Sequence, residues 1–194
     1  MSFFYGVYPA DRAISRLFDL ARLIVQPDFA RKAHITLRGP YDERPSPKSK
    51  WLRLNLSDAT LLRPSTFFND FQNTVYLGVS IIEMDDIAWK PDFSGGTPHL
   101  SIYDGRDRVF AWQVLEVLRE FPWKIDIELT PVLILEKKRE FSSSFFLELD
   151  EVDVAFEYIA ERPLRREYIR NMHVGQRIYY LRKICETIHL LGRE

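Results

Sequence analysis

The chain contains one four-residue phrase twice, and this repeat restricts the possible folds more than any other feature. Residues 34–37 read HITL and residues 99–102 read HLSI: a histidine, an aliphatic residue, a small hydroxyl residue and a second aliphatic residue. Successive side chains of a β-strand point to opposite faces. Each histidine therefore shares a face with the hydroxyl of its own copy. We expect one sheet to carry both copies, with the aliphatic faces buried under a helix and the polar faces in one cleft.

The polar residues of the repeat suit acid–base chemistry at a phosphorus atom without a metal. The unperturbed pKa of imidazole is about 6.5, so near neutral pH one of His34 and His99 can act as a base and the other as an acid. Placed on opposite sides of a phosphodiester, they could deprotonate a nucleophile and protonate the leaving oxygen. The hydroxyls of Thr36 and Ser101 would donate to the non-bridging oxygens and stabilise their growing charge.

The chain has four histidines, and only two begin the phrase. His173 is followed by Val-Gly and His189 by Leu-Leu, so neither repeats the pattern. The alternative interpretation is structural: His34 and His99 would then be half-buried strand residues without a catalytic role.

Two His-x-Thr/Ser phrases in a chain of this size resemble the 2H phosphoesterase superfamily, which includes 2′-5′ RNA ligase-like proteins and cyclic phosphodiesterases. The resemblance covers roughly the first 150 residues. It implies an α+β, bilobal fold: two antiparallel-sheet lobes related by a pseudo-twofold, a central cleft, and helices on the outer faces. It also implies that the histidines are the acid and the base. By the family pattern, His34 would protonate the leaving oxygen and His99 would activate water.

Tyr41 and Tyr103 follow the two copies of the phrase at similar distances. Both are candidates for contacts to a base or ribose of the substrate. Loop and core roles for these tyrosines remain open.

Hydrophobic spacing predicts a strand over 3–8, helices over 10–25 and 108–121, strands over 51–62 and 74–83, and a short helix over 64–72. The first phrase thus has its long helix before it, whereas the second has its long helix after it, which departs from the simplest picture of the family. We expect residues 1–150 to form the two-lobed domain. Residues 151–194 are expected to form a helical C-terminal extension packed on that domain.

The C-terminal extension is locally basic. Between residues 162 and 183 there is one acid, Glu167, against these seven basic residues: Arg162, Arg165, Arg166, Arg170, Arg177, Arg182 and Lys183. Tyrosines at 168, 179 and 180 could stack on bases, so this segment is a candidate RNA contact. The alternative is a helix that docks its apolar stripe on the acidic body or on another subunit, since charged runs are usually solvated faces.

Composition limits the classes of partner and compartment. With 194 residues and a formal net charge of −1, the chain does not fit a protein that holds long nucleic acid by bulk charge, although a small phosphorylated substrate remains compatible. Cys185 is the only cysteine, and no stretch is apolar enough to span a membrane. We expect a soluble, cytoplasmic protein without a membrane partner. The sequence does not indicate the oligomeric state.

Metal and cofactor motifs such as His-Glu-x-x-His, Cys-x-x-Cys and the dinucleotide fingerprint do not occur. A metal held by both histidines and an acid such as Asp104 is conceivable, but it would leave the paired hydroxyls unexplained. We therefore expect no cofactor.

The sequence predicts a metal-independent phosphodiesterase that hydrolyses a 2′-linked or cyclic phosphodiester in a nucleotide, cyclic oligonucleotide or short RNA. Two alternatives remain: a nucleotide- or RNA-binding module with little or no turnover, and RNA 2′-5′ ligation. A third is an interaction protein in which the two phrases are coincidental.

Overall fold

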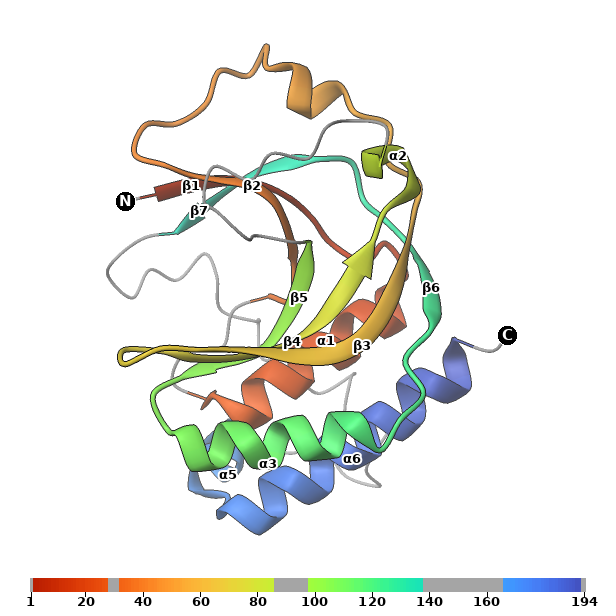
Figure 1. The fold of residues 1–194 in the computed structure, drawn as a ribbon. Coiled ribbons are helices and arrows are strands. Elements are labelled where there is room, and N and C mark those ends of the chain that lie inside the picture. Colours follow the sequence, from red (N-terminus) through yellow and green to blue (C-terminus); the bar gives the residue numbers. More distant parts are fainter. Residues whose placement is uncertain (1, 28–31, 86–97, 138–165, 193–194) are drawn as a thin grey trace.

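The computed structural model describes residues 2–27, 32–85, 98–137 and 166–192. They form an α+β fold, as expected (Figure 1). The strands are β1 Ser2–Val7, β2 Ile35–Tyr41, β3 Asp58–Phe68, β4 Asn73–Ser80, β5 His99–Gly105, β6 Ile125–Glu128 and β7 Leu133–Lys137. The helices are α1 Arg12–Val25, α2 Ile82–Asp85, α3 Arg108–Arg119, α5 Arg166–Asn171 and α6 Val174–Leu191, with a 3-10 helix over Lys50–Arg53.

The described strands form one seven-stranded sheet in the order β6-β3-β4-β5-β2-β1-β7, and every pairing is antiparallel. The two separate sheets that the family resemblance implies are thus joined into one, because β2 pairs with β5. β5 contains the whole second copy of the repeated phrase, and β2 begins at Ile35, the second residue of the first copy. Both copies of the phrase consequently lie at the middle of the sheet, where each strand has a partner on both sides.

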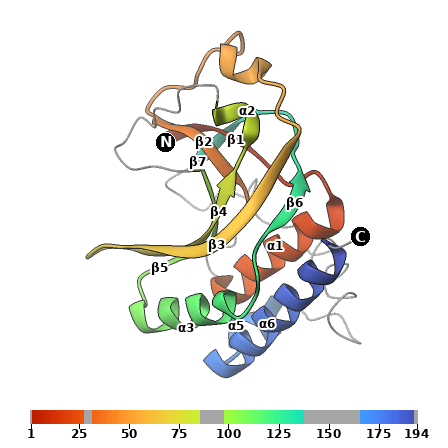
Figure 2. The same cartoon turned by 45° about the vertical axis from the view of Figure 1, so that its right-hand side comes forward.

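Helices α1, α3 and α6 gather on one side of the sheet (Figures 1 and 2). Both α1 and α3 begin at an aspartate that caps the first turn: Asp11 accepts the N–H of Ile14, and Asp107 accepts the N–H of Phe110. The order of the two long helices relative to the two phrases is therefore as predicted.

The described part of the C-terminal extension packs on this helix layer. Leu181, Ile184 and Ile188 of α6 are at most 1% exposed and belong to the same core as the buried residues of α1 and α3. At the surface, Arg182 donates two hydrogen bonds of 2.7 Å to the carboxylate of Glu120, at the end of α3. Burial also raises the pKa of the Cys185 thiol, which stays protonated inside this core.

The prediction of a short helix over 64–72 is wrong. Residues 58–68 form one long strand, β3, which pairs with β4 from Thr60 to Phe68. The register shifts between Leu61 and Pro64, and a bulge of this kind is one of the places where a strand tolerates proline. The strand predicted over 51–62 begins later than expected. Residues 50–53 form the 3-10 helix, and β3 starts only at Asp58.

Candidate active site

The two copies of the repeated phrase pair with each other. Ile35 of β2 lies opposite Leu100 of β5, and each is the second residue of its copy. Continued by one residue in each direction, this antiparallel register sets Thr36 opposite His99 and His34 opposite Ser101. A local twofold axis therefore passes between the two strands, and each histidine faces the hydroxyl residue of the other copy.

Burial follows the alternation that the sequence predicts. The four aliphatic residues lie in the core: Ile35, Leu37 and Leu100 are 0% exposed, and Ile102 is 2% exposed. The histidine and hydroxyl residues of both copies are half-buried. We call the face that carries these four polar side chains the histidine face.

The pairing fixes the scale of the site. In an antiparallel pair, directly opposite residues have Cβ atoms about 4.5–5.5 Å apart, and diagonal neighbours about 7–8 Å apart. His34 and His99 are diagonal neighbours in this register. The four polar side chains of the histidine face therefore start from one small patch of the sheet.

The two halves of the sheet share a further irregularity. The pairing of β2 with β1 skips one residue between Thr36 and Arg38, and the pairing of β5 with β4 skips one between Ser101 and Tyr103. Each motif strand therefore carries a bulge directly after its hydroxyl residue. A bulge reverses the alternation of faces, and bulges are frequent next to active sites. The internal symmetry thus extends beyond the four-residue phrase.

A backbone contact orients the ring of His34. Its Nδ1 lies 2.9 Å from the carbonyl oxygen of Lys32. Because a carbonyl oxygen can only accept, Nδ1 carries the proton and Nε2 is the nitrogen that gains or loses one. The ring of Tyr8 meets the His34 ring edge-on at 6.4 Å between centroids. Burial, and then the charge of Asp19, raise the pKa of the Tyr8 hydroxyl, which therefore stays neutral.

His99 has a tyrosine beside it as well. The ring of Tyr76, on the neighbouring strand β4, lies 4.7 Å from the His99 ring between centroids, with a tilt of 46°. Tyr76 is opposite Ser101 in the sheet, so it stands on the histidine face. Each histidine thus packs against a tyrosine: Tyr76 of β4 beside His99, and Tyr8, the residue directly after β1, beside His34.

Two charged residues of α1 support the histidine face from behind. Asp19 is 4% exposed, and its carboxylate accepts the N–H of Ala33, the residue before His34. Arg22 is 5% exposed and donates a 2.7 Å hydrogen bond to the carbonyl oxygen of Ser101. We did not select these residues from the sequence. The sequence feature that could have indicated them is the presence of two charged residues on the apolar, buried side of the predicted helix.

The structure does not bring Tyr41 and Tyr103 to the histidine face. Tyr41 is opposite Phe3, a buried residue, and its hydroxyl accepts a 2.9 Å hydrogen bond from Arg38. Tyr103 follows the bulge of β5 and is 4% exposed, with its hydroxyl 3.1 Å from the N–H of Asp107. Both rings are therefore packed against neighbouring residues, and Tyr103 also borders a groove at the end of β5.

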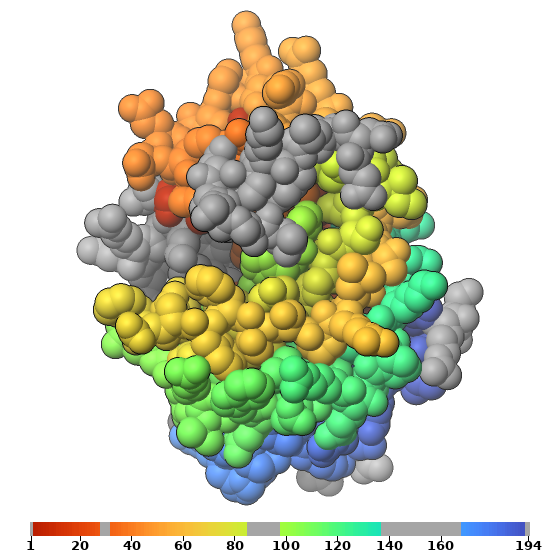
Figure 3. Space-filling model, in the orientation of Figure 1, coloured from red at the N-terminus to blue at the C-terminus, as the bar shows by residue number. Residues whose placement is uncertain are grey.

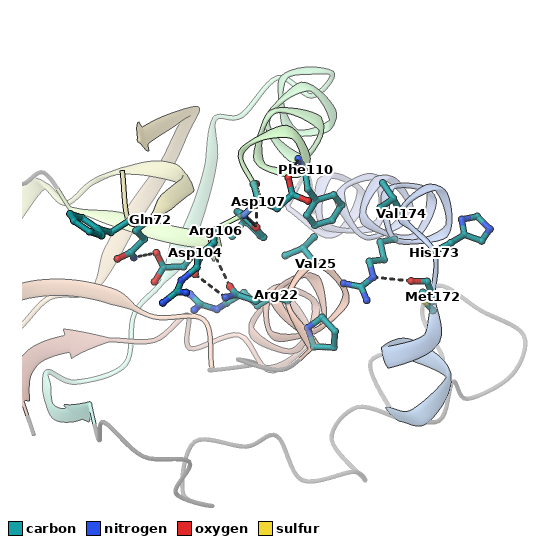
Figure 4. Close-up of a pocket in the computed structure, with 16 residues that line it drawn as sticks. Arg22, Val25, Gln72, Asp104, Arg106, Asp107, Phe110, Met172, His173 and Val174 are labelled. Atoms are coloured by element: carbon teal, nitrogen blue, oxygen red, sulfur yellow. Dashed lines mark hydrogen bonds between the residues drawn. The ribbon is translucent and has the colours of Figure 1, made fainter. Parts of the chain in front are cut away.

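A groove of about 1020 Å³ lies at the end of β5, where α1 ends and α3 and α6 begin (Figure 4). The side-chain amide of Gln26 closes its floor by pairing with the backbone of Asp104, at 2.8 and 3.1 Å. Tyr103, Arg106 and Phe71 are among its lining residues.

In the space-filling view, atoms of β5 are visible in the middle of the face that Figure 3 shows, directly above the band formed by β3 and β4.

Several cations of the basic extension are already bound within the protein. Arg182 pairs with Glu120, Lys183 lies 2.9 Å from Glu186, and Arg177 donates to the carbonyl oxygens of Met172 and Arg170. Arg162 and Arg165 lie outside the described residues. These contacts favour docking over RNA binding for the described part of the extension.

Within the described parts of the chain, no three His, Cys, Asp or Glu side chains form a group that could hold a metal ion. None of the helices described is both long and apolar enough to cross a membrane. The chain matches no protein-family model, no curated protein and no solved structure with which it was compared.

Proposed function

We propose that this protein is a metal-independent phosphodiesterase that hydrolyses a 2′-linked or cyclic phosphodiester in a nucleotide, cyclic oligonucleotide or short RNA. The observation that carries the proposal is the pairing of Ile35 with Leu100. Through this one register, two histidines and two hydroxyls that are far apart in the sequence share one face of the sheet. Under this proposal, each half of the single sheet would correspond to one lobe of the 2H phosphoesterase resemblance.

In the proposed reaction the phosphodiester lies between the two imidazoles. His99 takes a proton from water as the water oxygen forms a new bond to phosphorus. The bond from phosphorus to the leaving ribose oxygen breaks, and His34 delivers a proton to that oxygen through Nε2. Thr36 and Ser101 donate to the non-bridging oxygens, whose charge grows in the transition state. Proton exchange with solvent then restores both histidines.

The near symmetry of the site makes the two roles exchangeable. A reaction in the reverse direction uses His34 as the base and His99 as the acid, by microscopic reversibility. Ligation of a 2′,3′-cyclic RNA end would use the same acid–base pair, with a 5′-hydroxyl in place of water as the nucleophile. The bond from phosphorus to the 3′ oxygen of the cyclic phosphate breaks, that oxygen takes the proton, and a 2′-5′ bond remains.

Hydrolysis of a substrate panel in EDTA tests the proposal. The panel contains 2′,3′-cyclic nucleotides, 2′-5′-linked oligoadenylates and cyclic oligonucleotides, and each is incubated with the wild type, His34→Ala and His99→Ala. Removal of an acid or base typically costs a factor of about 10²–10⁴. We expect turnover that persists in EDTA and falls by at least about 10² in each variant. Circular dichroism checks that both variants are folded.

Three results would contradict the proposal. Turnover that EDTA abolishes would indicate a metal enzyme. Turnover that survives both substitutions would assign the chemistry to other residues. No turnover of any substrate, together with nucleotide binding that His34→Ala leaves intact, would indicate a binding module.

A further inference from the structure

The groove at the end of β5 contains a carboxylate with one oxygen available to a ligand. Both Thr74, at 2.8 Å, and the amide of Gln72 donate to Oδ1 of Asp104. Within the described residues, Oδ2 of Asp104 accepts no hydrogen bond. Figure 4 shows Gln72 and Asp104 facing each other at one end of the groove. An ionised carboxylate only accepts hydrogen bonds, so Oδ2 suits a ligand that presents an N–H group.

A cation lines the same groove as this carboxylate. Arg106 lines the groove and is exposed, and its guanidinium forms no hydrogen bond or ion pair with a described residue. The start of α6 also lines the groove, through Val174. Guanidinium groups bind phosphate oxygens in a bidentate manner, and the partial positive charge at a helix start favours an anion. The groove thus offers a phosphate contact close to its N–H acceptor.

The third feature of the groove, after the carboxylate and the cation, is an exposed aromatic ring. Phe71, in the turn between β3 and β4, lines the groove and is 84% exposed. Hydrogen bonds hold the backbone of this turn, because the side chain of Asn69 accepts the N–H groups of both Phe71 and Gln72 at 2.8 Å. An exposed ring on a fixed turn is a surface on which a nucleobase can stack.

We propose that this groove binds a second nucleotide of the substrate, one whose base carries an exocyclic amino group. Phe71 stacks on the base, Oδ2 of Asp104 accepts the amino N–H, and Arg106 binds a phosphate. Asp104 is opposite Thr74, two residues from Tyr76 on β4, so its side chain lies on the histidine face, further along β5 than Ser101. This inference rests on the proposed function. It makes the substrate class an oligonucleotide of at least two units and favours adenine, cytosine or guanine over uracil in the groove.

The test compares a one-nucleotide substrate with a two-nucleotide substrate. Phe71→Ala and Arg106→Gln are assayed on 2′,3′-cyclic AMP and on the 2′-5′-linked adenylate dinucleotide. Loss of one stacked base or one charged hydrogen bond weakens binding by about 5- to 150-fold. We expect KM for the dinucleotide to rise within this range. The kcat/KM for 2′,3′-cyclic AMP should stay within about twofold of the wild type.

Asp104→Asn tests base selection, since asparagine can still accept from Thr74 but adds an amide donor. We expect the wild type to prefer the adenylate over the uridylate dinucleotide by about tenfold, and the variant to lose this preference. Arg53→Gln in the 3-10 helix is the control, because Arg53 is exposed and does not line the groove. This variant should not change the kinetics of either substrate.

Binding to the inactive His34→Ala/His99→Ala protein separates the two proposals. If no substrate is hydrolysed but the dinucleotide binds this protein and Phe71→Ala weakens that binding, the nucleotide groove stands and the proposed function fails. If 2′,3′-cyclic AMP is hydrolysed and the groove variants do not affect the dinucleotide, or the dinucleotide is not a substrate, the groove assignment fails and the proposed function stands. Absence of both turnover and binding overturns both.

Discussion

At the scale of single residues, the hydroxyls of Thr36 and Ser101 are as necessary to the proposed mechanism as the two histidines. Thr36 and Ser101 directly follow the paired residues Ile35 and Leu100. In the proposed mechanism, both hydroxyls donate to oxygens whose charge grows in the phosphoryl transition state. Loss of one donor to such a charge commonly costs about 10²–10³ in kcat. A purely structural role for the hydroxyls would instead change stability without changing the chemical step.

We therefore predict that Thr36→Val and Ser101→Ala each lower kcat by about 10²–10³. Ile35→Val is the matched control, because Ile35 neighbours Thr36 but points to the core. It should cost about 0.5–1.5 kcal/mol of stability and leave kcat within about twofold. Steady-state kinetics and chemical denaturation measure the two quantities. Equal kcat in the wild type and both hydroxyl variants would remove the hydroxyls from the mechanism.

At the scale of elements, sequence patterns predicted most of the helices and strands. The strands at β1 and β4, the helices α1, α3 and α6, and the alternation of the two motif strands all followed from hydrophobic spacing and capping residues. The 64–72 segment did not: Phe67 and Phe68 extend β3 and pair with β4, and Phe71 lies in the turn that follows. Asp19 and Arg22 were also missed: their value depends on the backbone of two strands that the helix meets only after folding.

The contact between α3 and α6 gives a pH-dependent prediction at this scale. Hydrogen bonds from Arg182 hold the pKa of the Glu120 carboxyl below its usual value. A lowered pKa in the folded state means that the pair stabilises the protein above the unfolded-state pKa of about 4.3. This stability is lost as the pH falls through the folded-state pKa. Both side chains are partly exposed, so the gain is about 0.2–1 kcal/mol.

Glu120→Gln should thus lower the free energy of unfolding by this amount at pH 7 and by progressively less below pH about 4.3. Urea denaturation at several pH values measures the difference from the wild type. In an Arg182→Gln background the same substitution should have almost no effect, since the partner is gone. A difference that does not change with pH would contradict the ion-pair explanation.

At the scale of the whole molecule, the site depends on one sheet that joins both halves of the chain. The sequence predicted that two histidines and two hydroxyls would share a cleft, but not which residue faces which, because register depends on long-range pairing. The groove at the end of β5 could not be predicted at all. Its walls come from α1, the β3–β4 turn, β5 with α3, and the start of α6, and no local pattern links these segments.

The pH dependence of kcat/KM tests the central claim most directly, namely that His34 and His99 are an acid–base pair. On the best substrate found in EDTA, the wild type should give a bell-shaped profile with one acidic and one basic limb. With hydrolysis in the proposed direction, His99→Ala should lose the acidic limb, where the base is protonated, and His34→Ala the basic limb, where the acid is deprotonated. A profile that keeps both limbs in both variants would show that neither histidine is the titrating group, and would contradict the account.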